Sequence, residues 1–485
     1  MSDYMFMLEN HLSSAQSKMI AEIQAVAAEA NVAIFLTGGA MRDMLGGFPL
    51  REIDFTVEGN ALKLAKAVAV KAGAKVESID EQRKLAKLQF PGGALTTIGM
   101  ARTERYSKPG AKPQVHAATI YEDLRGRDFT INAIAISLSR ASRALIVDPN
   151  NGIGDLERHE LRAISNYTLY DDPVRMLRLL RFRARLGFTI DERTMSQFEN
   201  AREAEMHTRI TPEALMEELR HTAEEPDPGA VIAALDEQKL LHLYSPALTG
   251  AKLNTTGFQK LHKAKQMVPF GSDTRVENFG LFLNVLTEKL TPKEKAAFIK
   301  ALGMPKADVE RWQKLEGRAK KLESALKAAT LRKASQVYAV LRKAAGEEIL
   351  FLIVRSAQRV VQDRIRNYFE KYLPAAQEVT EAEVQAAGGG VPGTPKYEKM
   401  RAQTIAKKLD ARPRKPPEPT PEELAAANGA PVPGTPGVPG RPGVPGTPGA
   451  PGAPGGEVKR RSPDPVLAIS ARRRAQEPVV TGARK

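Results

Sequence analysis

A glycine pair followed by two carboxylates one residue apart is the part of this sequence with the clearest capacity for chemistry. Gly38 and Gly39 allow a tight turn that brings backbone N–H groups close to an anion, and the helix expected after them points its positive end at the same place. Arg42 adds a planar guanidinium at the start of that helix. Glu52 and Asp54 share one face of an expected strand, because side chains alternate along a strand. This order predicts a phosphate-binding turn beside two carboxylates.

The two carboxylates are candidate ligands for a metal ion. The chain contains no cysteine, which excludes disulfides and thiolate metal sites, so a metal must bind oxygen or imidazole ligands. Magnesium ions suit paired carboxylates, and they neutralise charge on a transferring phosphate and lower the pKa of an attacking hydroxyl. We therefore expect Glu52 and Asp54 to bind Mg²⁺ as the cofactor. Each signal alone is more often an ordinary turn or surface strand, so the expectation rests on their combination.

The composition of the chain indicates the class of partner and the compartment. Its 485 residues carry a net charge of +15, which suits a protein that binds a polyanion such as RNA, DNA or an acidic membrane face. No apolar run approaches the ~18 residues of a membrane span, and the first residues are acidic where a signal peptide is basic. The expectation is a soluble, cytoplasmic protein without a membrane partner.

Apolar periodicity predicts an α+β fold, in which an α/β head with a mixed sheet precedes an all-α region from about 156 to 373. Helices are expected over 1–30, 41–45 and 61–74. The expected strands are 32–36, 53–57, 86–90, 94–101, 131–137 and 144–148.

Four regions follow from this pattern. They are a head over 1–150, a helical neck over 151–225, a helical body over 226–378, and a Pro/Gly-rich basic tail over 379–485 that we expect to be disordered. Part of the tail has glycine at every third position, a collagen-like spacing that we interpret as an extended solvated linker. Within the body, 318–345 alternates apolar and basic positions, which predicts one packed face and one face that is solvated or meets RNA backbone.

The head motifs resemble those of the class II nucleotidyltransferases, the family of tRNA CCA-adding enzymes and bacterial poly(A) polymerases. That family carries G-G-x-x-R-D followed by D-x-D, which match GGAMRD and EID of this chain. Its later motifs are similar to ARTERY, EDLRGRDFTINAIAIS, IVDPNNGIGDLERHELRAI and YDDPVRMLRLLRFRARLGF. The matching motifs keep the family order over roughly 34–190, and the resemblance fades beyond about residue 220.

The resemblance implies roles for the first motifs. Backbone groups of Gly38 and Gly39, together with Arg42, are implied to contact a nucleoside triphosphate, whereas Asp43 is expected to anchor structure. Asp54 keeps the second family aspartate, while glutamate replaces the first at position 52. Because glutamate is one methylene longer and magnesium geometry is strict, this departure bears on the rate or the metal preference.

The next motif contains a second departure. The family's R-R-D-F matches Gly126, Arg127 and Asp128, so the first arginine is missing here. The acid is implied to recognise the ribose 2′-hydroxyl, and Asn132 is kept. Thr97 stands where the family often has an acid. Glu104 and Asp123 could supply a third carboxylate, although a salt bridge in the loop to Arg102 or Arg105 is the favoured interpretation.

The helix after residue 170 is implied to select the nucleotide. Asp172 and Arg175 match the acid and arginine of the family's E-D-x-x-R, and residues three apart share a helix face. A carboxylate acceptor beside a guanidinium donor can read the edge of cytosine or adenine, whereas guanine and uracil present the reverse polarity. Arg178 and Arg181 continue this face toward phosphates. Standing alone, the stretch is an ordinary amphipathic helix.

The resemblance implies a template-independent CCA-adding tRNA nucleotidyltransferase whose partners are tRNA, CTP and ATP. A poly(A) polymerase, or an enzyme that adds only A or only CC, shares every motif. A third hypothesis is an inactive head kept as an RNA-binding module, motivated by Glu52, Gly126 and Thr97. The sequence does not indicate the oligomeric state.

Overall fold

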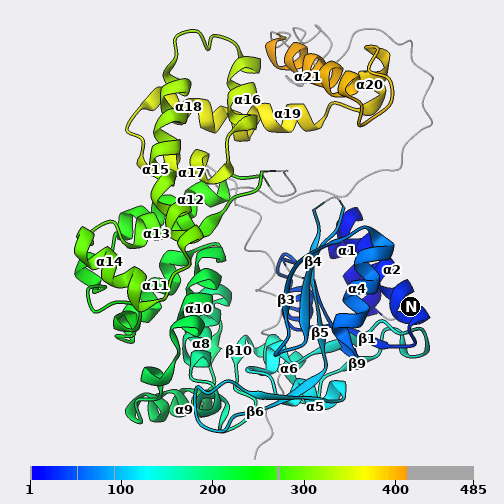
Figure 1. The fold of residues 1–485 in the computed structure, drawn as a ribbon, viewed down its shortest axis with the longest axis vertical. Coiled ribbons are helices and arrows are strands. Elements are labelled where there is room, and N and C mark those ends of the chain that lie inside the picture. The colour runs from blue at the N-terminus through cyan, green and yellow to red at the C-terminus, as the bar shows by residue number, and fades with distance from the viewer. Residues whose placement is uncertain (1–2, 52, 92, 270–273, 412–485) are drawn as a thin grey trace, which may run out of the picture. The chain divides into compact units, whose positions relative to one another are not determined.

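The sheet of the head positions the predicted site. In the computed structural model, which describes residues 3–51, 53–91, 93–269 and 274–411, it contains β1 (Ala33–Thr37), β2 (Ile53–Glu58), β3 (Lys75–Asp80), β4 (Leu85–Gln89), β5 (Leu95–Met100), β8 (Ala135–Ser137) and β9 (Ile146–Val147). The strand order is β3-β4-β5-β2-β1-β8-β9, with β2 parallel to β5 and the other neighbours antiparallel (Figure 1). The fold class is α+β with a mixed sheet, as the sequence predicts.

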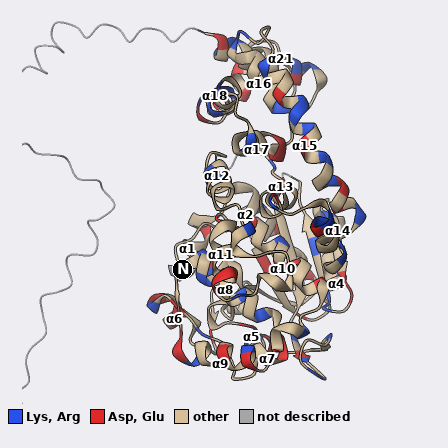
Figure 2. Ribbon diagram, turned by 90° about the vertical axis from the view of Figure 1, so that its left-hand side faces the viewer, with Lys and Arg blue, Asp and Glu red and all other residues tan. Residues whose placement is uncertain are grey.

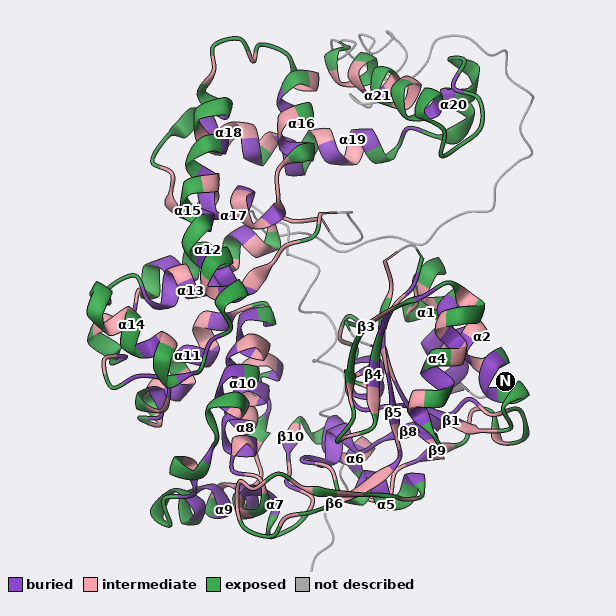
Figure 3. Cartoon of the chain, in the orientation of Figure 1, coloured by how far each residue is buried: buried purple, intermediate pink, exposed green. Residues whose placement is uncertain are grey.

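Helices cover one face of this sheet, and Ile120 and Leu124 pack against Phe35 on part of the other face, the rest of which is open. The helices of the head are α1 (Asp3–His11), α2 (Ser14–Glu29), α3 (Gly39–Leu45), α4 (Ala61–Ala72) and α5 (Ile120–Arg125). Along β2, Ile53, Phe55 and Val57 are buried in the core that includes α4. Figure 3 shows buried residues on α4 and along the neighbouring strands of the sheet. Asp54 and Thr56 alternate with them and line the open side. The alternation in the sequence therefore decides which face of β2 carries polar groups.

Some elements of the head differ from the sequence prediction. The helix expected over 1–30 is two helices, because Ser13 caps α2 by accepting a hydrogen bond from the backbone N–H of Gln16. Strand β3 was not expected, since its side chains are mostly exposed. The separate hairpin of β6 (Arg102–Arg105) and β7 (Gln114–Ala117) was not expected either. Exposed edge strands carry little apolar periodicity, which is the signal that sequence analysis uses.

The region after the head is helical, as expected. Only two-residue strands interrupt it among the described residues, β10 (Glu160–Leu161) and β11 (Thr189–Ile190). The helices are α6 (Gly152–Arg158), α7 (Thr168–Asp171), α8 (Val174–Leu186), α9 (Glu192–Glu203), α10 (Pro212–Glu224), α11 (Pro228–Glu237), α12 (Thr255–Gln266), α13 (Asn278–Leu286), α14 (Pro292–Ala301), α15 (Lys306–Lys327), α16 (Ala334–Lys343), α17 (Gly346–Arg355), α18 (Arg359–Asn367) and α19 (Leu373–Gln377). None of the helices described is long and apolar enough to cross a membrane.

Helices α8 and α10 face the open side of the sheet. Helix α8 follows Pro173 and ends at Gly187, whose left-handed φ of 69° suits a residue without a Cβ. Helix α10 starts after Thr211, whose side chain accepts from the backbone N–H of Ala214. Both helices bury an apolar stripe and turn polar side chains toward the sheet.

The exposed face of α15 carries acidic and basic residues that lie close together along the helix. Figure 2 shows acidic and basic residues alternating along this helix. Lys314 lies 2.8 Å from Glu310, and Lys320 lies 2.8 Å from Glu316, each one helical turn apart. Solvent screens such exposed pairs, so they contribute little to stability. This face is therefore solvated and ion-paired. Binding of RNA backbone by this face stays a prediction.

Part of the expected disordered tail is folded. Helices α20 (Glu381–Ala386) and α21 (Pro395–Asp410) occupy sequence that was assigned to the tail over 379–485. Val384, Tyr397 and Ile405 are buried and form a small core with Ala376 and Val379. Sequence analysis missed these helices because neighbouring glycines and prolines masked their apolar spacing. The segment with collagen-like spacing and the final basic segments lie outside the described residues.

Candidate active site

A cavity of about 1000 Å³ lies between the open face of the sheet and helices α8 and α10. The predicted site residues that the structure describes all line this cavity: Gly38, Gly39, Arg42, Asp54, Arg127, Asp128, Asn132, Asp172, Arg175 and Arg178. Residues from four separate stretches of sequence thus meet at one place. Glu52 lies outside the described residues.

The glycine pair forms the turn between β1 and α3. Gly38 has φ 66° and ψ −126°, a conformation that side-chain-bearing residues rarely adopt. A Cβ built on Gly38 would lie 3.1 Å from Nη1 of Arg127, and one on Gly39 would lie 3.4 Å from Nη2 of Arg42. The predicted tight turn is therefore confirmed, and it brings the backbone within reach of two guanidinium groups. Its contact with an anion stays a prediction.

Asp54 projects from β2 into the cavity. Its backbone aligns with Thr37 of β1 and Thr97 of β5, so hydroxyl-bearing residues flank it on both neighbouring strands. Oxygen ligands of this kind suit magnesium. The described residues contain no cluster of three or more histidines or acids that could hold a metal. Joint binding of a metal ion by Glu52 and Asp54 stays a prediction.

Arg42 is buried and held in a fixed orientation. Its Nε donates to Oδ1 of Asp43 at 2.9 Å, and its Nη1 donates to Oδ1 of Asn132 at 2.8 Å. Burial lowers the pKa of Arg42, against the opposing effect of Asp43. Asp43 also accepts from Nη2 of Arg185 at 2.7 Å, which agrees with the structural role expected for it. Arg42 thus enters the cavity wall already oriented by two side chains.

Arg127 is held by four hydrogen bonds to three residues. Its Nε and Nη2 donate to Oδ2 of Asp123 at 2.9 and 2.7 Å, its Nη1 to the carbonyl of Asn132 at 3.1 Å, and its Nη2 also to the hydroxyl of Thr56 at 3.1 Å. Its guanidinium therefore occupies one position beside the glycine turn. The carboxylate of Asp123 is committed to Arg127 and to the backbone N–H of Arg102 at 3.1 Å.

Asp128 has all its acceptor positions engaged. Oδ1 accepts from the backbone N–H of Phe129 at 2.7 Å and from Nδ2 of Asn132 at 3.0 Å. Oδ2 accepts from Nε and Nη2 of Arg178 at 2.9 and 2.5 Å. Burial alone would raise the pKa of Asp128, but Arg178 and Arg175 outweigh burial and hold it well below the usual carboxyl range. The carboxylate stays ionised and fixed.

Asp172 and Arg175 are held more loosely than their neighbours. Nε of Arg175 lies 3.7 Å from Oδ2 of Asp172, and its Nη1 and Nη2 approach the carbonyls of Arg127 and Gly126 at 3.4 Å. Burial raises the pKa of Asp172 above the usual carboxyl range, despite the nearby Arg175. The pair lies at the wall of the cavity, with donor and acceptor capacity left for another molecule.

Glu104 lines the same cavity as Asp54, and two neighbouring side chains engage its carboxylate. It accepts from Nε of Arg102 at 2.9 Å and from the hydroxyl of Tyr106 at 2.7 Å. Burial would raise the pKa of Glu104, but Arg102 and Tyr106 lower it below its usual value. The salt bridge to Arg102, which the sequence favoured, is confirmed, although both residues lie on strand β6 rather than in a loop.

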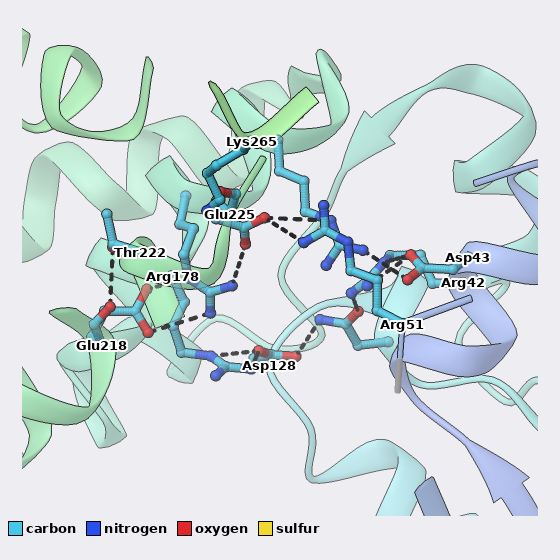
Figure 4. Close-up of polar contacts among 12 residues, drawn as sticks. Arg42, Asp43, Arg51, Asp128, Arg178, Glu218, Thr222, Glu225 and Lys265 are labelled. Carbon is cyan, nitrogen blue, oxygen red and sulfur yellow. Dashed lines mark hydrogen bonds and ion pairs between the residues drawn. The ribbon is translucent and has the colours of Figure 1, made fainter. Parts of the chain in front are cut away.

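A buried network of ion pairs fixes α8 to α10 and to the head, and sequence reasoning missed it (Figure 4). Arg181 donates from Nε to Oε1 of Glu218 at 2.6 Å and from Nη1 to Oε1 of Glu225 at 2.9 Å. Nη1 of Arg51, in the head, lies 3.0 Å from Oε2 of Glu225. Nζ of Lys265, in α12, donates to the carbonyls of Glu225 and Ala223 at 2.6 and 2.8 Å. Arg181 therefore belongs to the framework rather than to a free phosphate-binding face.

One signal in the sequence marks this network. Glu218 occupies a position on the apolar stripe of α10, between Leu215 and Leu219, and is only 3% exposed. Acids are almost never fully buried unless they are paired. An acid at a core position of a helix therefore predicts a buried cation opposite it.

Phe182 lies at the centre of the guanidinium groups. Its ring centroid is 5.1, 5.5 and 4.7 Å from Cζ of Arg42, Arg178 and Arg181 respectively. The ring of Phe129 packs edge-on against it at 5.9 Å. The face of an aromatic ring attracts cations. Phe182 thus contacts one arginine of the head and two of the neck.

Comparison with protein families identifies part of the chain. Residues 34–162 match the model of the Poly A polymerase head domain. An A-adding tRNA nucleotidyltransferase of Aquifex aeolicus is 28% identical over 345 residues, which cover 70% of this chain and 40% of that protein. An A-adding enzyme of Halalkalibacterium halodurans is 32% identical over 270 residues, covering 55% of this chain and 62% of that one.

A CC-adding tRNA nucleotidyltransferase of Deinococcus radiodurans is 32% identical over 201 residues, or 41% of this chain and 52% of that protein. The chain spans less than two thirds of the length of these relatives. A solved apo structure of a CCA-adding enzyme superimposes with a TM-score of 0.49 at 24% identity, covering 87% of this chain and 97% of that one. Residues 34–162, which supply the glycine turn and Asp54, are thus similar to the poly A polymerase head domain, and the relatives named here are tRNA nucleotidyltransferases.

Proposed function

We propose that this protein is a template-independent tRNA nucleotidyltransferase that adds C, C and A from CTP and ATP to the 3′ end of tRNA. The observation that carries the proposal is the placement of Asp172 and Arg175 on the wall of the cavity that also contains Asp54. A carboxylate acceptor and a guanidinium donor, 3.7 Å apart, thus face the same space as the candidate catalytic acid. The relatives named above support the same class of reaction.

Asp172 and Arg175 select the base in this proposal. The amino groups of cytosine and adenine can donate to the carboxylate of Asp172, and an adjacent ring nitrogen can accept from Arg175. Guanine and uracil present the opposite arrangement at the same edge. Because the pair makes only long contacts in the structure, a base can replace those contacts without breaking a strong ion pair.

The remaining residues orient the triphosphate and the sugar. Backbone groups of Gly38 and Gly39 and the guanidinium of Arg42 bind the triphosphate on one side of Asp54. The hydrogen bonds to Asp43 and Asn132 keep Arg42 in place. The ribose contact implied for Asp128 requires Arg178 to release one of its two hydrogen bonds, since the carboxylate is otherwise saturated.

The reaction follows from this arrangement. The 3′-hydroxyl of tRNA attacks the α-phosphorus, the new O–P bond forms, and pyrophosphate leaves on the opposite side. Glu52 and Asp54 would hold Mg²⁺, which when bound neutralises phosphate charge and lowers the pKa of the attacking hydroxyl. Positioning by Arg42, Asp172 and Arg175 supplies the orientation that makes the attack effectively unimolecular.

A second candidate is an enzyme that adds only the terminal A or only CC. It is favoured by the names of the relatives, which include A-adding and CC-adding enzymes. All the cavity contacts described above serve either activity, because both cytosine and adenine fit the same donor and acceptor. Only the products separate the two candidates.

The test uses purified protein, magnesium and tRNA transcripts that end before CCA or after CC. We expect three added residues from CTP plus ATP on the first transcript. Addition of A to the second transcript, with no addition to the first, would favour the A-adding candidate. Asp54→Asn should abolish addition, while Asp80→Asn, which changes a cavity-lining acid on the edge strand β3, should leave addition measurable. Glu52→Asp tests the first departure from the family. Absence of any addition by the natural sequence would refute the proposal.

A further inference from the structure

Lys87 is an exposed cation on the same face of the sheet as Asp54. The register aligns Asp54 of β2 with Thr97 of β5, Thr97 with Lys87 of β4, and Lys87 with Ser78 of β3. Residues aligned across strands point to the same side of a sheet, and these four all line the cavity. Lys87 is therefore about two strand spacings from Asp54, or roughly 10 Å between Cα atoms.

Lys87 differs from neighbouring cations because no described carboxylate pairs with it. Nζ of Lys75 lies 2.9 Å from Glu77, and Nη1 of Arg83 lies 3.7 Å from Asp80. Asp80 also lines the cavity, so Arg83 offsets its charge there. An exposed lysine that faces a cavity without a counter-ion is available to an anionic ligand.

The position of Lys87 distinguishes it from the groups assigned to the triphosphate. Strand β2, which carries Asp54, has β1 on one side and β5 followed by β4 on the other. Gly38 and Arg42 follow β1, whereas Lys87 lies on β4. Anion-binding groups therefore flank Asp54 from opposite sides. In phosphoryl and nucleotidyl transfer the attacking and leaving oxygens lie roughly in line on opposite sides of phosphorus.

We propose that Lys87 is a positioning residue that binds a backbone phosphate of the RNA primer close to its 3′ end. The inference rests on the proposed function, because it assigns the leaving pyrophosphate to the β1 side of Asp54 and the attacking strand to the β4 side. The cavity volume of about 1000 Å³ is at the upper end of the range for small-molecule sites. Space therefore remains in the cavity beside a single bound nucleotide. Contact with the primer phosphate brings the 3′-hydroxyl toward Asp54.

Lys87 could instead bind the triphosphate of the incoming nucleotide. Kinetic measurements distinguish binding of the primer phosphate from binding of the triphosphate. We compare Lys87→Gln, Lys87→Arg and the natural protein, with Lys75→Gln as the matched control. Lys75 is an exposed lysine of the adjacent strand that pairs with Glu77 and does not line the cavity. The measurements are KM for the tRNA transcript, KM for ATP and CTP, and equilibrium binding of the transcript at several salt concentrations.

We expect Lys87→Gln to raise KM and Kd for the transcript about 5-fold and to reduce the magnitude of the salt slope by roughly 0.7, the value for one phosphate of a single strand. KM for nucleotides should stay unchanged, Lys87→Arg should restore transcript binding, and Lys75→Gln should behave as the natural protein. An increase in nucleotide KM alone, or equal effects of the two glutamine variants, would overturn the inference.

Failure of the proposed function gives a separate result. If the natural protein adds no nucleotide, the proposed function falls, whatever the variants do. If it adds nucleotides and Lys87→Gln leaves both KM and transcript binding unchanged, the assignment of Lys87 falls while the activity stands.

Discussion

The start and the middle of the neck helix α8 hold their charged side chains in different ways. At its start, Arg175 approaches its polar partners only at 3.4–3.7 Å. In the middle, Arg178 and Arg181 bind carboxylates at 2.5–2.9 Å. Both parts of the helix line the same cavity. The difference indicates that the middle serves as framework and the start remains available to a ligand.

The pKa values of two acids express the same contrast. The pKa of Asp128 is lowered, because Arg178 and Arg175 outweigh its burial, whereas the pKa of Asp172 is raised, since burial dominates there. A carboxylate with saturated hydrogen bonds contributes rigidity. A desolvated carboxylate with few partners gains more from a donor on an incoming base. The following variants test this division, in order of decreasing effect on the free energy of unfolding.

Arg181→Ala should cause the largest loss of stability. It leaves Glu218, which is 3% exposed, without its cation and weakens the network around Glu225. Breaking a buried ion pair by removing one partner costs about 3–5 kcal/mol. Urea unfolding followed by circular dichroism measures the change. Arg183→Ala, on a partly exposed position of the same helix, is the control and should cost less than about 0.5 kcal/mol. Equal losses would show that the middle of α8 is not a rigid framework.

Asp128→Asn should cost about 1–2 kcal/mol at pH 7, because it weakens charged hydrogen bonds to Arg178. The folded pKa of Asp128 is lowered, so its stabilisation is fully present above the unfolded value of about 3.9 and is lost as pH falls through the folded pKa. The difference between the natural protein and the variant should stay constant from pH 8 to 5 and shrink below about 4. A difference that disappears by pH 6 would contradict this assignment.

Arg175→Ala should change stability least, by less than about 1 kcal/mol, because only long contacts are lost. Its effect should fall on nucleotide choice. Loss of a base-reading group costs about 1–3 kcal/mol of discrimination, so preference for CTP and ATP over GTP and UTP should fall roughly 5- to 150-fold. Ratios of kcat/KM for the four nucleotides measure it. Unchanged ratios with a lower rate would assign Arg175 to the framework instead.

Sequence reasoning located the head well because its signals are local. The apolar run of β2 and the glycine turn at Gly38 each follow from a few adjacent residues, and the structure confirms both. The ion pairs of Arg181 could not be read in this way, because they join residues 37 and 44 positions apart. The placement of Asp128 against Arg178 likewise depends on packing of the neck on the head. The spacing in the sequence predicts which face of an element each residue occupies, but it does not predict which residue it pairs with.

The folded segment at the end of the described chain changes where the tail should be cut. Helix α21 packs its Tyr397 and Ile405 against Ala376 and Val379, residues that belong to the preceding helical region. Truncation near residue 380 would remove α21 and expose the apolar surface beneath it to water. A loss of activity after this truncation could therefore reflect aggregation. A stop codon placed after Asp410 keeps α21 and removes the Pro/Gly-rich segment together with the final basic segments, so it is the sound boundary for domain dissection.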